Sequence, residues 1–536
     1  MQSDLNTLEF SAIRRSLEAD CATPYGKEAA RNLEPAPSLE VARAFQGAVS
    51  TAREACDAGD APKLGEIPDV RAALRQASQS GASPLNGMAL RNLITVMQTG
   101  EYLARALEKR PGLYVGNAAD LTAPSPLIDR FDATVDTMGR VRAEASEELA
   151  RLHGEIQSVR ADLDKEVAKK QKDKKLAPHL VEPKTEHYSG PRRVLAVKHE
   201  AVGNIKGARR EALSRGRGVM VEPMEWIPLN NRLEQLAKEV DAEERRVLKE
   251  ATGTVAENGA ALQQLLDAVT WLDLALGAGR LSARIEGVAP ELSEEPRLEL
   301  KDARHPALVA EYKNGGPVPV PLSVSLTADS PMVLITGPNT GGKTVAIKTI
   351  GLLATMAFCG LHIPAAEGTV VGGYRRILVD IGDHQSILHH VSTFAGHVEI
   401  LKQILAAADE RTLVLMDEMG TGTDPEEGAA LAMSVLEELA ERGVQGVFTT
   451  HLSPLKGFAD NHRAIRNANM RFDFERLAPT YQLSVGEAGA SLGLVVAERN
   501  GLEEPLLSRA RAHLEELRPG ATTERGSAGG SGDTGF

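Results

Sequence analysis

The sequence predicts a multidomain protein that is mainly α-helical and also contains an α/β domain. Two long stretches repeat apolar residues at steps of three and four, which is the helical period. Nearer the carboxyl end, three short apolar runs alternate with helical patterns, as in a largely parallel sheet. Only 4% of the 536 residues are aromatic, which argues against a β-sandwich. A chain of this length has room for about two to four cores.

The first part of the chain contains helical patterns separated by proline turns such as Pro35-Ala36-Pro37. We expect residues 1–138, together with 277–322, to form a helical core. Residues 139–276 are expected to form an arm, and residues 323–517 the α/β domain. The glycine- and serine-rich segment 518–536 has the composition of a disordered tail.

Two apolar seams define the predicted arm. The first begins at Val141 and runs through Val167, and the second begins at Leu229 and runs through Leu272. Each predicts a long helix with one apolar face. Because the seams flank a compact insert at 177–228, they predict the outgoing and returning helices of a long antiparallel coiled coil.

The insert and the residues before it are basic, although the chain carries a formal net charge of −13. Between Lys165 and Arg217 there are 15 Lys or Arg and 6 Asp or Glu, and the run KKQKDKK covers Lys169 to Lys175. Clustered basic side chains favour contact with a polyanion such as DNA or ribosomal RNA. Ordinary solvated surface charge is the alternative interpretation.

The segment GPNTGGKT follows the apolar run MVLIT and precedes a helical pattern, which is the context of a phosphate-binding P-loop. Its glycines let backbone N–H groups point at phosphate oxygens, and the next helix adds its positive end. Lys343 is expected to reach the β- and γ-phosphates of ATP, and the Thr344 hydroxyl to ligate Mg²⁺. The predicted phosphate-binding residues are Gly337, Pro338, Asn339, Thr340, Gly341, Gly342, Lys343 and Thr344.

Two further apolar runs end in polar residues that suit the same site. TLVLM leads into Asp417 and Glu418, where Asp417 is expected to hold Mg²⁺ and Glu418 to polarise the attacking water. The run VQGVFT leads to Thr450 and His451, and His451 is expected to sense the γ-phosphate. A structural role for this histidine is the alternative.

The amino terminus lacks the pattern of a signal peptide, and no apolar run is long enough to cross a bilayer. The three cysteines, Cys21, Cys56 and Cys359, are far apart and have no zinc or disulfide spacing. We therefore expect a cytoplasmic protein without a membrane partner.

Five motifs in order resemble the ATPase domain of MutS proteins, and the bacterial MutS type-two branch is the most similar. They are GPNTGGKT, DIGDHQSI at 380–387, VSTFAGH at 391–397, DEMGTGTDPEEGAAL at 417–431 and TTHLSPLK at 449–456. Four segments outside the ATPase region also resemble that branch: LEF at 8–10, GKE at 26–28, VEPMEWIPLNNRL at 221–233 and DARHPAL at 302–308. The resemblance reaches to about residue 517.

This resemblance implies an ABC-type ATPase that works as a homodimer. The signature segment of one subunit, which maps to Ser392-Thr393-Phe394, would complete the nucleotide site of the other. Ser392 would then act in trans, and the loop 420–424 would lie at the dimer interface. Val320 and Tyr481 occupy positions that could enclose adenine, although a place in the apolar core suits either equally well.

The sequence departs from two patterns of the family. No phenylalanine is followed two residues later by glutamate, so the wedge of mismatch-reading MutS proteins is missing and mismatch recognition is not expected. Type-two members continue into an Smr nuclease domain, whereas no HGxG-like segment occurs here. Endonuclease activity is therefore not expected of these residues.

Two functions follow from the resemblance, and a third shares only the nucleotide motifs. The first is an ATP-dependent clamp that binds branched or recombining DNA and suppresses homologous recombination. The alternative is a ribosome-associated ATPase that splits stalled or collided ribosomes and contacts rRNA. The third function is a transporter ATPase subunit, which would have the same nucleotide motifs but would need no long arm. A basic arm tip suits DNA and rRNA alike, so the sequence leaves the first two open.

Overall fold

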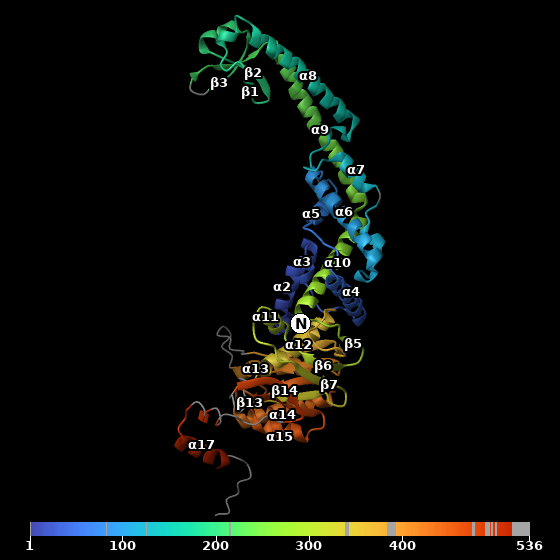
Figure 1. The fold of residues 1–536 in the computed structure, drawn as a ribbon, viewed down its shortest axis with the longest axis vertical. Coiled ribbons are helices and arrows are strands. Elements are labelled where there is room, and N and C mark those ends of the chain that lie inside the picture. The colour runs from blue at the N-terminus through green and yellow to red at the C-terminus, as the bar shows by residue number, and fades with distance from the viewer. Residues whose placement is uncertain are drawn as a thin grey trace, which may run out of the picture. The chain divides into compact units, whose positions relative to one another are not determined.

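A computed structural model of the chain describes residues 2–81, 83–124, 126–213, 216–337, 342–382, 393–473, 478–487, 494, 497–498 and 501–516. The chain divides into two compact units, whose elements are labelled in Figure 1. Unit 1 comprises 1–21, 27–61 and 274–536, and unit 2 comprises 22–26 and 62–273. The second boundary falls inside helix α10 (Gly259–Ile285). Within the described ranges, no helix combines the length and apolar character needed to cross a bilayer.

Unit 1 contains a six-stranded, largely parallel sheet, and the three predicted apolar runs form three of its strands, β8, β11 and β12. Its strand order is β10-β11-β12-β8-β13-β14, and every neighbouring pair is parallel except β13 and β14. The bounds are β8 Met332–Thr336, β10 Arg376–Asp380, β11 Thr412–Met416, β12 Gln445–Thr449, β13 Ile465–Asp473 and β14 Ala478–Val485. Strands β8, β11 and β12 are buried along their whole length, which explains their continuous apolar sequence.

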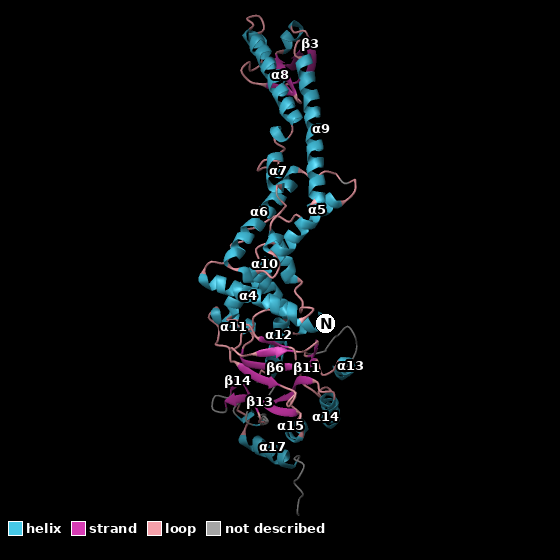
Figure 2. Ribbon diagram, turned by 90° about the vertical axis from the view of Figure 1, so that its right-hand side faces the viewer, coloured by secondary structure: helices cyan, strands magenta, loops and turns pink. Residues whose placement is uncertain are grey.

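Helices cover both faces of this sheet (Figures 1 and 2). Val414 and Met416 of β11 share a core with Leu436 and with other residues of the helices that follow. Leu415, between them in sequence, faces the opposite side, where it lies against Gly351 of α12. The helices of unit 1 are α1 Gln2–Thr7, α2 Phe10–Asp20, α4 Leu39–Ala58, α11 Pro306–Lys313, α12 Lys343–Phe358, α13 Thr393–Ala407, α14 Pro425–Glu441, α15 Ser453–Asn461 and α17 Glu504–Glu516.

A second sheet in unit 1 was not predicted. Its order is β5-β9-β6-β7, with bounds β5 Glu291–Ser293, β6 Arg297–Ala303, β7 Leu322–Leu326 and β9 Val370–Gly372. The strands are short, and glycine and proline punctuate the sequence between them, so their apolar pattern is weak.

The side chain of His362 connects three segments of unit 1. Its Nε2 lies 2.9 Å from Ser50 Oγ on α4, and its Nδ1 lies 2.8 Å from Ser282 Oγ on α10. Arg53 also reaches the Ser282 hydroxyl, at 3.3 Å. His362 is only 6% exposed, and this burial, with a smaller contribution from the charge of Arg53, lowers the pKa of His362 to about 4. The histidine is therefore neutral in the folded protein at neutral pH.

Unit 2 contains the predicted helix pair. Its helices are α5 Arg71–Ser78, α6 Gly87–Lys109, α7 Leu127–Thr134, α8 Glu147–Lys172 and α9 Ile227–Glu257, and helix α3 Pro24–Arg31 begins in this unit. Leu149 and Leu152, near the start of α8, share a core with Val240 and Val247 of α9. Near the other end of α8, Leu163 and Val167 pack with residues at the start of α9. The two helices are therefore antiparallel (Figure 2).

The helices are shorter than the two seams suggested. Val141 precedes α8 and forms an isolated bridge with Val135, and α8 begins only after Ser146, whose side chain accepts from Leu149 N at 3.1 Å. The second seam is divided between α9 and α10. Asn258 ends α9, and its side chain donates to Thr254 O at 2.8 Å. Capping side chains, which the apolar period does not reveal, set these boundaries.

The insert between α8 and α9 folds into a small antiparallel sheet with the order β1-β2-β4-β3. Its bounds are β1 His187–Ser189, β2 Arg192–Val197, β3 Gly207–Ala212 and β4 Val219–Pro223. We call α8 and α9 the arm, and residues 173–226 the tip. Leu195, Val197 and Trp226 of the tip share a core with Leu163 and Val167 of the arm.

A buried carboxylate organises the charges of the tip. Glu222 is fully buried and accepts hydrogen bonds from Arg192 at 3.0 Å, Arg210 at 3.0 Å and Asn230 at 2.8 Å. Burial alone would raise the pKa of Glu222, but these hydrogen bonds outweigh it and hold the pKa below its ordinary value. Arg193 is likewise paired, with Glu186 at 2.6 Å. These three arginines of the basic segment thus neutralise carboxylates within the tip.

Candidate nucleotide-binding site

The predicted phosphate loop joins a buried strand to a helix. β8 ends at Thr336, Gly337 follows with φ 130°, and Gly342 has φ 88° immediately before α12 begins at Lys343. These positive φ values are accessible to glycine and strained for other residues, so the sequence has glycine where the backbone requires it. The predicted phosphate contacts Pro338, Asn339, Thr340 and Gly341 lie outside the described residues.

Lys343 sits at the start of α12 with its side chain almost completely buried. It is 2% exposed, and its Nζ donates to Gly337 O at 2.6 Å, across the mouth of the loop. Burial lowers the pKa of Lys343, while the charges of Asp417 and Glu418 oppose that effect. The ammonium group is thus held beside the loop by a weak partner, a carbonyl oxygen, that a phosphate oxygen can replace.

Asp417 is positioned by hydroxyl groups from two other elements. Thr344 Oγ1 of α12 donates to Asp417 Oδ2 at 2.6 Å, and Thr449 Oγ1 at the end of β12 donates to Asp417 Oδ1. Asp417 N donates to Asp380 O at 2.8 Å, which ties the acidic segment to β10. The arrangement follows from the parallel sheet, because the carboxyl ends of β8, β11 and β12 meet at one edge.

Glu418 is the next residue, and its backbone is left-handed with φ 51°. Its N–H donates to Thr449 Oγ1 at 2.9 Å, so the same hydroxyl fixes both acidic residues. A non-glycine residue with positive φ is uncommon and is strained unless its surroundings hold it in place. The hydrogen bond to Thr449 supplies that restraint and turns the chain sharply at the end of β11.

His451 and Ser392 are the two remaining predicted site residues. His451 is exposed, two residues after β12, and the neighbouring Thr450 N donates to Ile335 O of β8 at 3.1 Å. The segment that carries His451 therefore lies next to the strand that precedes the phosphate loop. Ser392 lies outside the described residues.

Residues just after Ser392 line a small cavity with the acidic pair. Phe394 and His397 of α13 surround it together with Asp417 and Glu418, and its volume is about 30 Å³. His397 Nδ1 lies 3.1 Å from Asp380 Oδ2, which links α13 to the end of β10. The sequence motifs that contain Asp380 and His397 thus meet the acidic pair in space.

Tyr481 lies at the other end of the phosphate loop. A Cβ added to Gly342 would be 2.9 Å from Tyr481 Cδ1, and the tyrosine side chain is 52% exposed. Its ring is therefore available beside the loop, whereas Val320 is half-buried in the segment before β7.

Thr449 is the site residue that sequence reasoning missed. A threonine at the end of an apolar strand is ordinary, so the sequence alone does not single it out as a site residue. The available signal was position: β12 is adjacent to β11 in the sheet, so a hydroxyl at its end can reach the acid at the end of β11.

The donor set suits Mg²⁺. Thr344 and Asp417 present a hydroxyl and a carboxylate in contact, and Mg²⁺ prefers such hard oxygen ligands, usually one or two from the protein with the rest from water and phosphate. The buried ammonium of Lys343 adds the positive charge that a polyphosphate needs.

Known proteins resemble both the α/β part and the chain as a whole. Residues 333–518 match the family described as MutS domain V, so the α/β part of the chain is similar to that domain. The chain is also similar to proteins named Endonuclease MutS2: 37% identical to that of Symbiobacterium thermophilum over 96% of the chain, 34% to that of Pelotomaculum thermopropionicum over 95%, and 33% to that of a Geobacillus species over 95%. The chain is MutS2-like.

The chain spans 63% to 65% of the length of these three relatives. The relatives are named as endonucleases, and that name describes the complete proteins.

Proposed function

We propose that this chain is an ATPase of the P-loop, ABC type that uses Mg-ATP to control a DNA-binding clamp. The observation that carries the proposal is the contact of Thr344 and Thr449 with the two oxygens of Asp417, beside the buried ammonium of Lys343. These groups come from the ends of three adjacent elements and converge where a strand–loop–helix segment can receive phosphate.

Each residue has a distinct part in the proposed reaction. Lys343 exchanges Gly337 O for the β- and γ-phosphate oxygens, and Thr344 and Asp417 hold Mg²⁺. The bound metal neutralises charge that develops on the phosphates. Glu418 orients and polarises the attacking water, while Thr449 keeps the two acids in register. His451 contacts the γ-phosphate from its place after β12.

Two substitutions and a control test the site. Lys343→Ala should abolish ATP binding, because the phosphates lose their main cation. Glu418→Gln should bind ATP but hydrolyse it about a hundredfold more slowly, because the carboxylate acts on the transition state. Lys402→Ala, which removes an exposed lysine paired with Glu399, should leave both measurements unchanged. Normal ATP affinity in the Lys343 variant would refute the assignment.

The homodimer is part of the proposal, with Ser392 of one subunit completing the site of the other. Subunits with Ser392→Ala should be inactive alone, as should subunits with Lys343→Ala. Mixing the two should restore one intact composite site and part of the ATPase activity. If activity does not return on mixing, the trans role of Ser392 is wrong.

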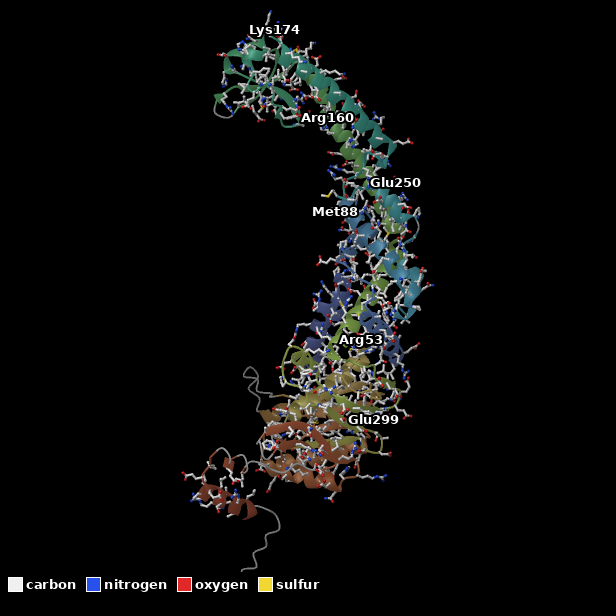
Figure 3. All side chains as sticks on the ribbon, viewed as in Figure 1. Arg53, Met88, Arg160, Lys174, Glu250 and Glu299 are labelled. Carbon is white, nitrogen blue, oxygen red and sulfur yellow. The ribbon has the colours of Figure 1, made fainter. Side chains whose placement is uncertain are left out.

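The arm is proposed as the clamp, a coiled coil within residues 139–276 that contacts nucleic acid with its tip. Support comes from the lysine run rather than from the arginines, because Arg192 and Arg210 hold Glu222. Lys172, Lys174 and Lys175 are exposed, and none has an ion-pair partner among the described residues. Figure 3 draws the Lys174 side chain on the outer side of the tip.

Phosphate contacts by these lysines would make binding depend on salt. Reversing all three to Glu should weaken binding of branched DNA and flatten the slope of log affinity against log salt by about 2.7, if each contacts one phosphate. The control reverses two exposed lysines of α9 outside the lysine run, Lys238 and Lys249, and is compared with the reversal of Lys174 and Lys175 alone. An unchanged affinity and slope would assign the run to ordinary surface charge.

We favour branched DNA, with suppression of recombination as the outcome, over the ribosome. Capture from lysate by the Glu418→Gln variant, with and without nuclease, separates the two. Branched DNA bound at physiological salt in the absence of ribosomes supports the clamp. Recovery of ribosomal subunits with their rRNA instead would establish the ribosome-splitting alternative.

A further inference from the structure

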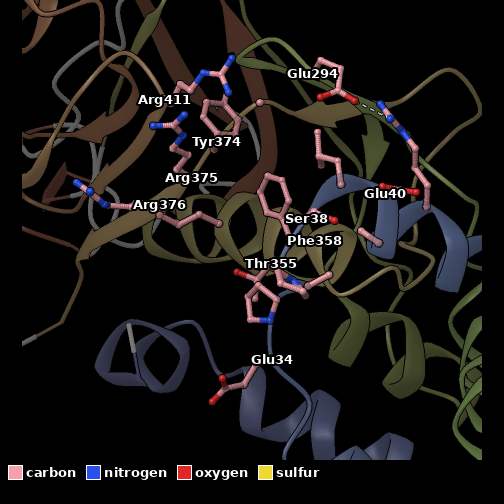
Figure 4. Close-up of a pocket in the computed structure, with 18 of the residues that line it drawn as sticks. Glu34, Ser38, Glu40, Glu294, Thr355, Phe358, Tyr374, Arg375, Arg376 and Arg411 are labelled. Atoms are coloured by element: carbon pink, nitrogen blue, oxygen red, sulfur yellow. Dashed lines mark hydrogen bonds and ion pairs between the residues drawn. The ribbon is translucent and has the colours of Figure 1, made fainter. Parts of the chain in front are cut away.

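Unit 1 contains a cavity that is separate from the nucleotide-binding residues. Its volume is about 980 Å³, which is large enough for a small organic ligand. The walls come from the chain before α4, the end of α12, the start of β10 and the residue before β11 (Figure 4). None of its lining residues belongs to the phosphate loop, the acidic pair or the segment of His451.

One wall of this cavity carries three arginines. Arg376 begins β10, while Arg375 and Arg411 lie directly before β10 and β11. Their proximity is fixed by the sheet: Arg375 N donates to Arg411 O at 2.7 Å, and Arg376 is paired in register with Thr412. Figure 4 shows the three side chains on one side of the cavity, together with Tyr374.

No carboxylate in the described part of the chain forms an ion pair with these arginines. Arg376 donates to a backbone oxygen, that of Ala407. Asp409 lies two residues before Arg411, and its carboxylate accepts from the Thr412 hydroxyl at 2.7 Å and from Arg411 N at 3.0 Å. The pKa of Asp409 is lowered mainly by the Thr412 hydrogen bond, with smaller contributions from the charges of Arg376 and Arg375. Arg375 and Arg411 thus have no carboxylate partner among the described residues, and Arg376 donates only to a backbone oxygen, so all three arginines can still donate to an anion.

The acidic residues of the lining lie elsewhere in the cavity. In Figure 4, Glu34, Glu40 and Glu294 are placed away from the arginine wall. Glu294 is already paired with Arg43 at 2.6 Å. An anion at the arginine wall therefore meets positive charge without a competing carboxylate in contact.

The rest of the cavity offers apolar and aromatic surface. The rings of Phe358 and Tyr374 meet edge to face, with centroids 6.4 Å apart and an angle of 85°. The hydroxyl of Tyr374 donates to Gln445, which fixes this ring in place. Leu5 and Ile377 extend the apolar lining. A flat ring can pack against such a surface while an attached anion reaches the arginines.

We propose that this cavity binds a nucleotide, with the phosphate on Arg375, Arg376 and Arg411 and the base against Phe358. Three guanidinium groups suit a dianionic phosphate better than a single carboxylate, because phosphate offers more acceptor oxygens and more charge. The proposal is independent of ATP hydrolysis at the phosphate loop.

Equilibrium dialysis of radiolabelled GMP against the full chain tests this site. The chain carries Lys343→Ala, which removes the main cation of the phosphate loop, so that GMP bound at that loop is not counted. We expect about one GMP per chain, bound more tightly than inorganic phosphate because the base adds apolar contact. Arg375→Ala with Arg411→Ala should weaken GMP binding at least about tenfold, through the loss of two charge-assisted contacts.

The matched control removes two exposed arginines from the same unit, by Arg442→Ala with Arg463→Ala. It should change GMP affinity less than about twofold, and near-ultraviolet circular dichroism verifies the folding of both double variants. Equal loss in the two double variants would overturn the proposal, since it would indicate only general electrostatic attraction. Absence of GMP binding, or equal affinity for GMP and phosphate, would overturn it as well.

Discussion

The buried His362 should make the stability of unit 1 depend on pH. Its pKa is about 4 in the folded protein and about 6.5 in an unfolded chain. The unfolded state therefore binds more protons between these values, and the free energy of unfolding falls as the pH drops below about 6.5. From these two pKa values the loss is about 2 kcal/mol at pH 5, and it approaches about 3.4 kcal/mol below pH 4.

The variant His362→Gln isolates this contribution. Glutamine does not titrate, and its amide can still hydrogen-bond to Ser50 or Ser282. The variant will be less stable at pH 7.5, but its stability should fall by about 2 kcal/mol less than that of the wild type between pH 7.5 and pH 5. Contributions from Asp and Glu residues cancel in this comparison.

Urea unfolding at the two pH values, followed by hydrogen exchange on peptides from α4 and α12, measures unit 1. The chain supplies its own control, because its two tryptophans, Trp226 and Trp271, both lie in unit 2. Tryptophan fluorescence should therefore show the same pH dependence in both proteins. If peptides of unit 1 lose equal stability in the wild type and the variant, the neutral buried state of His362 is wrong.

Three further predictions each concern one side chain. Thr449→Val should lower ATP turnover at least about tenfold, because Asp417 loses one of its two hydroxyl partners. The Mg²⁺ concentration needed for half-maximal activity should also rise, and titration of the ATPase activity with Mg²⁺ measures both effects. Burial lowers the pKa of Lys343, so ATP affinity should begin to fall at a lower pH than it would with a lysine of ordinary pKa. Calorimetry between pH 7 and pH 10 measures the affinity, and an affinity that stays constant over this range would contradict the prediction. Glu222→Ala should destabilise the tip by about 3 kcal/mol, because Arg192 and Arg210 lose the buried carboxylate that pairs them. Urea unfolding followed by tryptophan fluorescence measures this, and an unchanged free energy of unfolding would refute the role of Glu222.

The parts of the fold that the sequence predicted well are those with strong apolar periodicity. Strands β8 and β11 have the predicted bounds, Met332–Thr336 and Thr412–Met416, because each is a continuous buried run. The seams correctly identified buried positions such as Leu149 and Val167. They misjudged where helices begin and end, because Ser146 and Asn258 act through side-chain hydrogen bonds.

The sheet of the tip and the second sheet of unit 1 could not be predicted in the same way. Their strands are short, and several are amphipathic or charged, as in Gly207–Ala212. Arg192 and Arg210 looked like surface charge because their partner, Glu222, is brought to them only by strand pairing. The role of Thr449 in the site could not be predicted for a similar reason. Its hydroxyl reaches Asp417 only because β12 lies next to β11 in the sheet.

The shared core of the tip and the arm limits how this protein can be dissected. Leu163 and Val167 belong to the helix by sequence, yet they pack against Leu195 and Trp226 of the insert. An excised fragment that began at Asp173 and stopped at Trp226 would leave this core without one wall. A fragment used to transfer the tip to another protein must therefore include the last turns of α8 and the first turns of α9. A chimera joined within these two helices would retain the complete core.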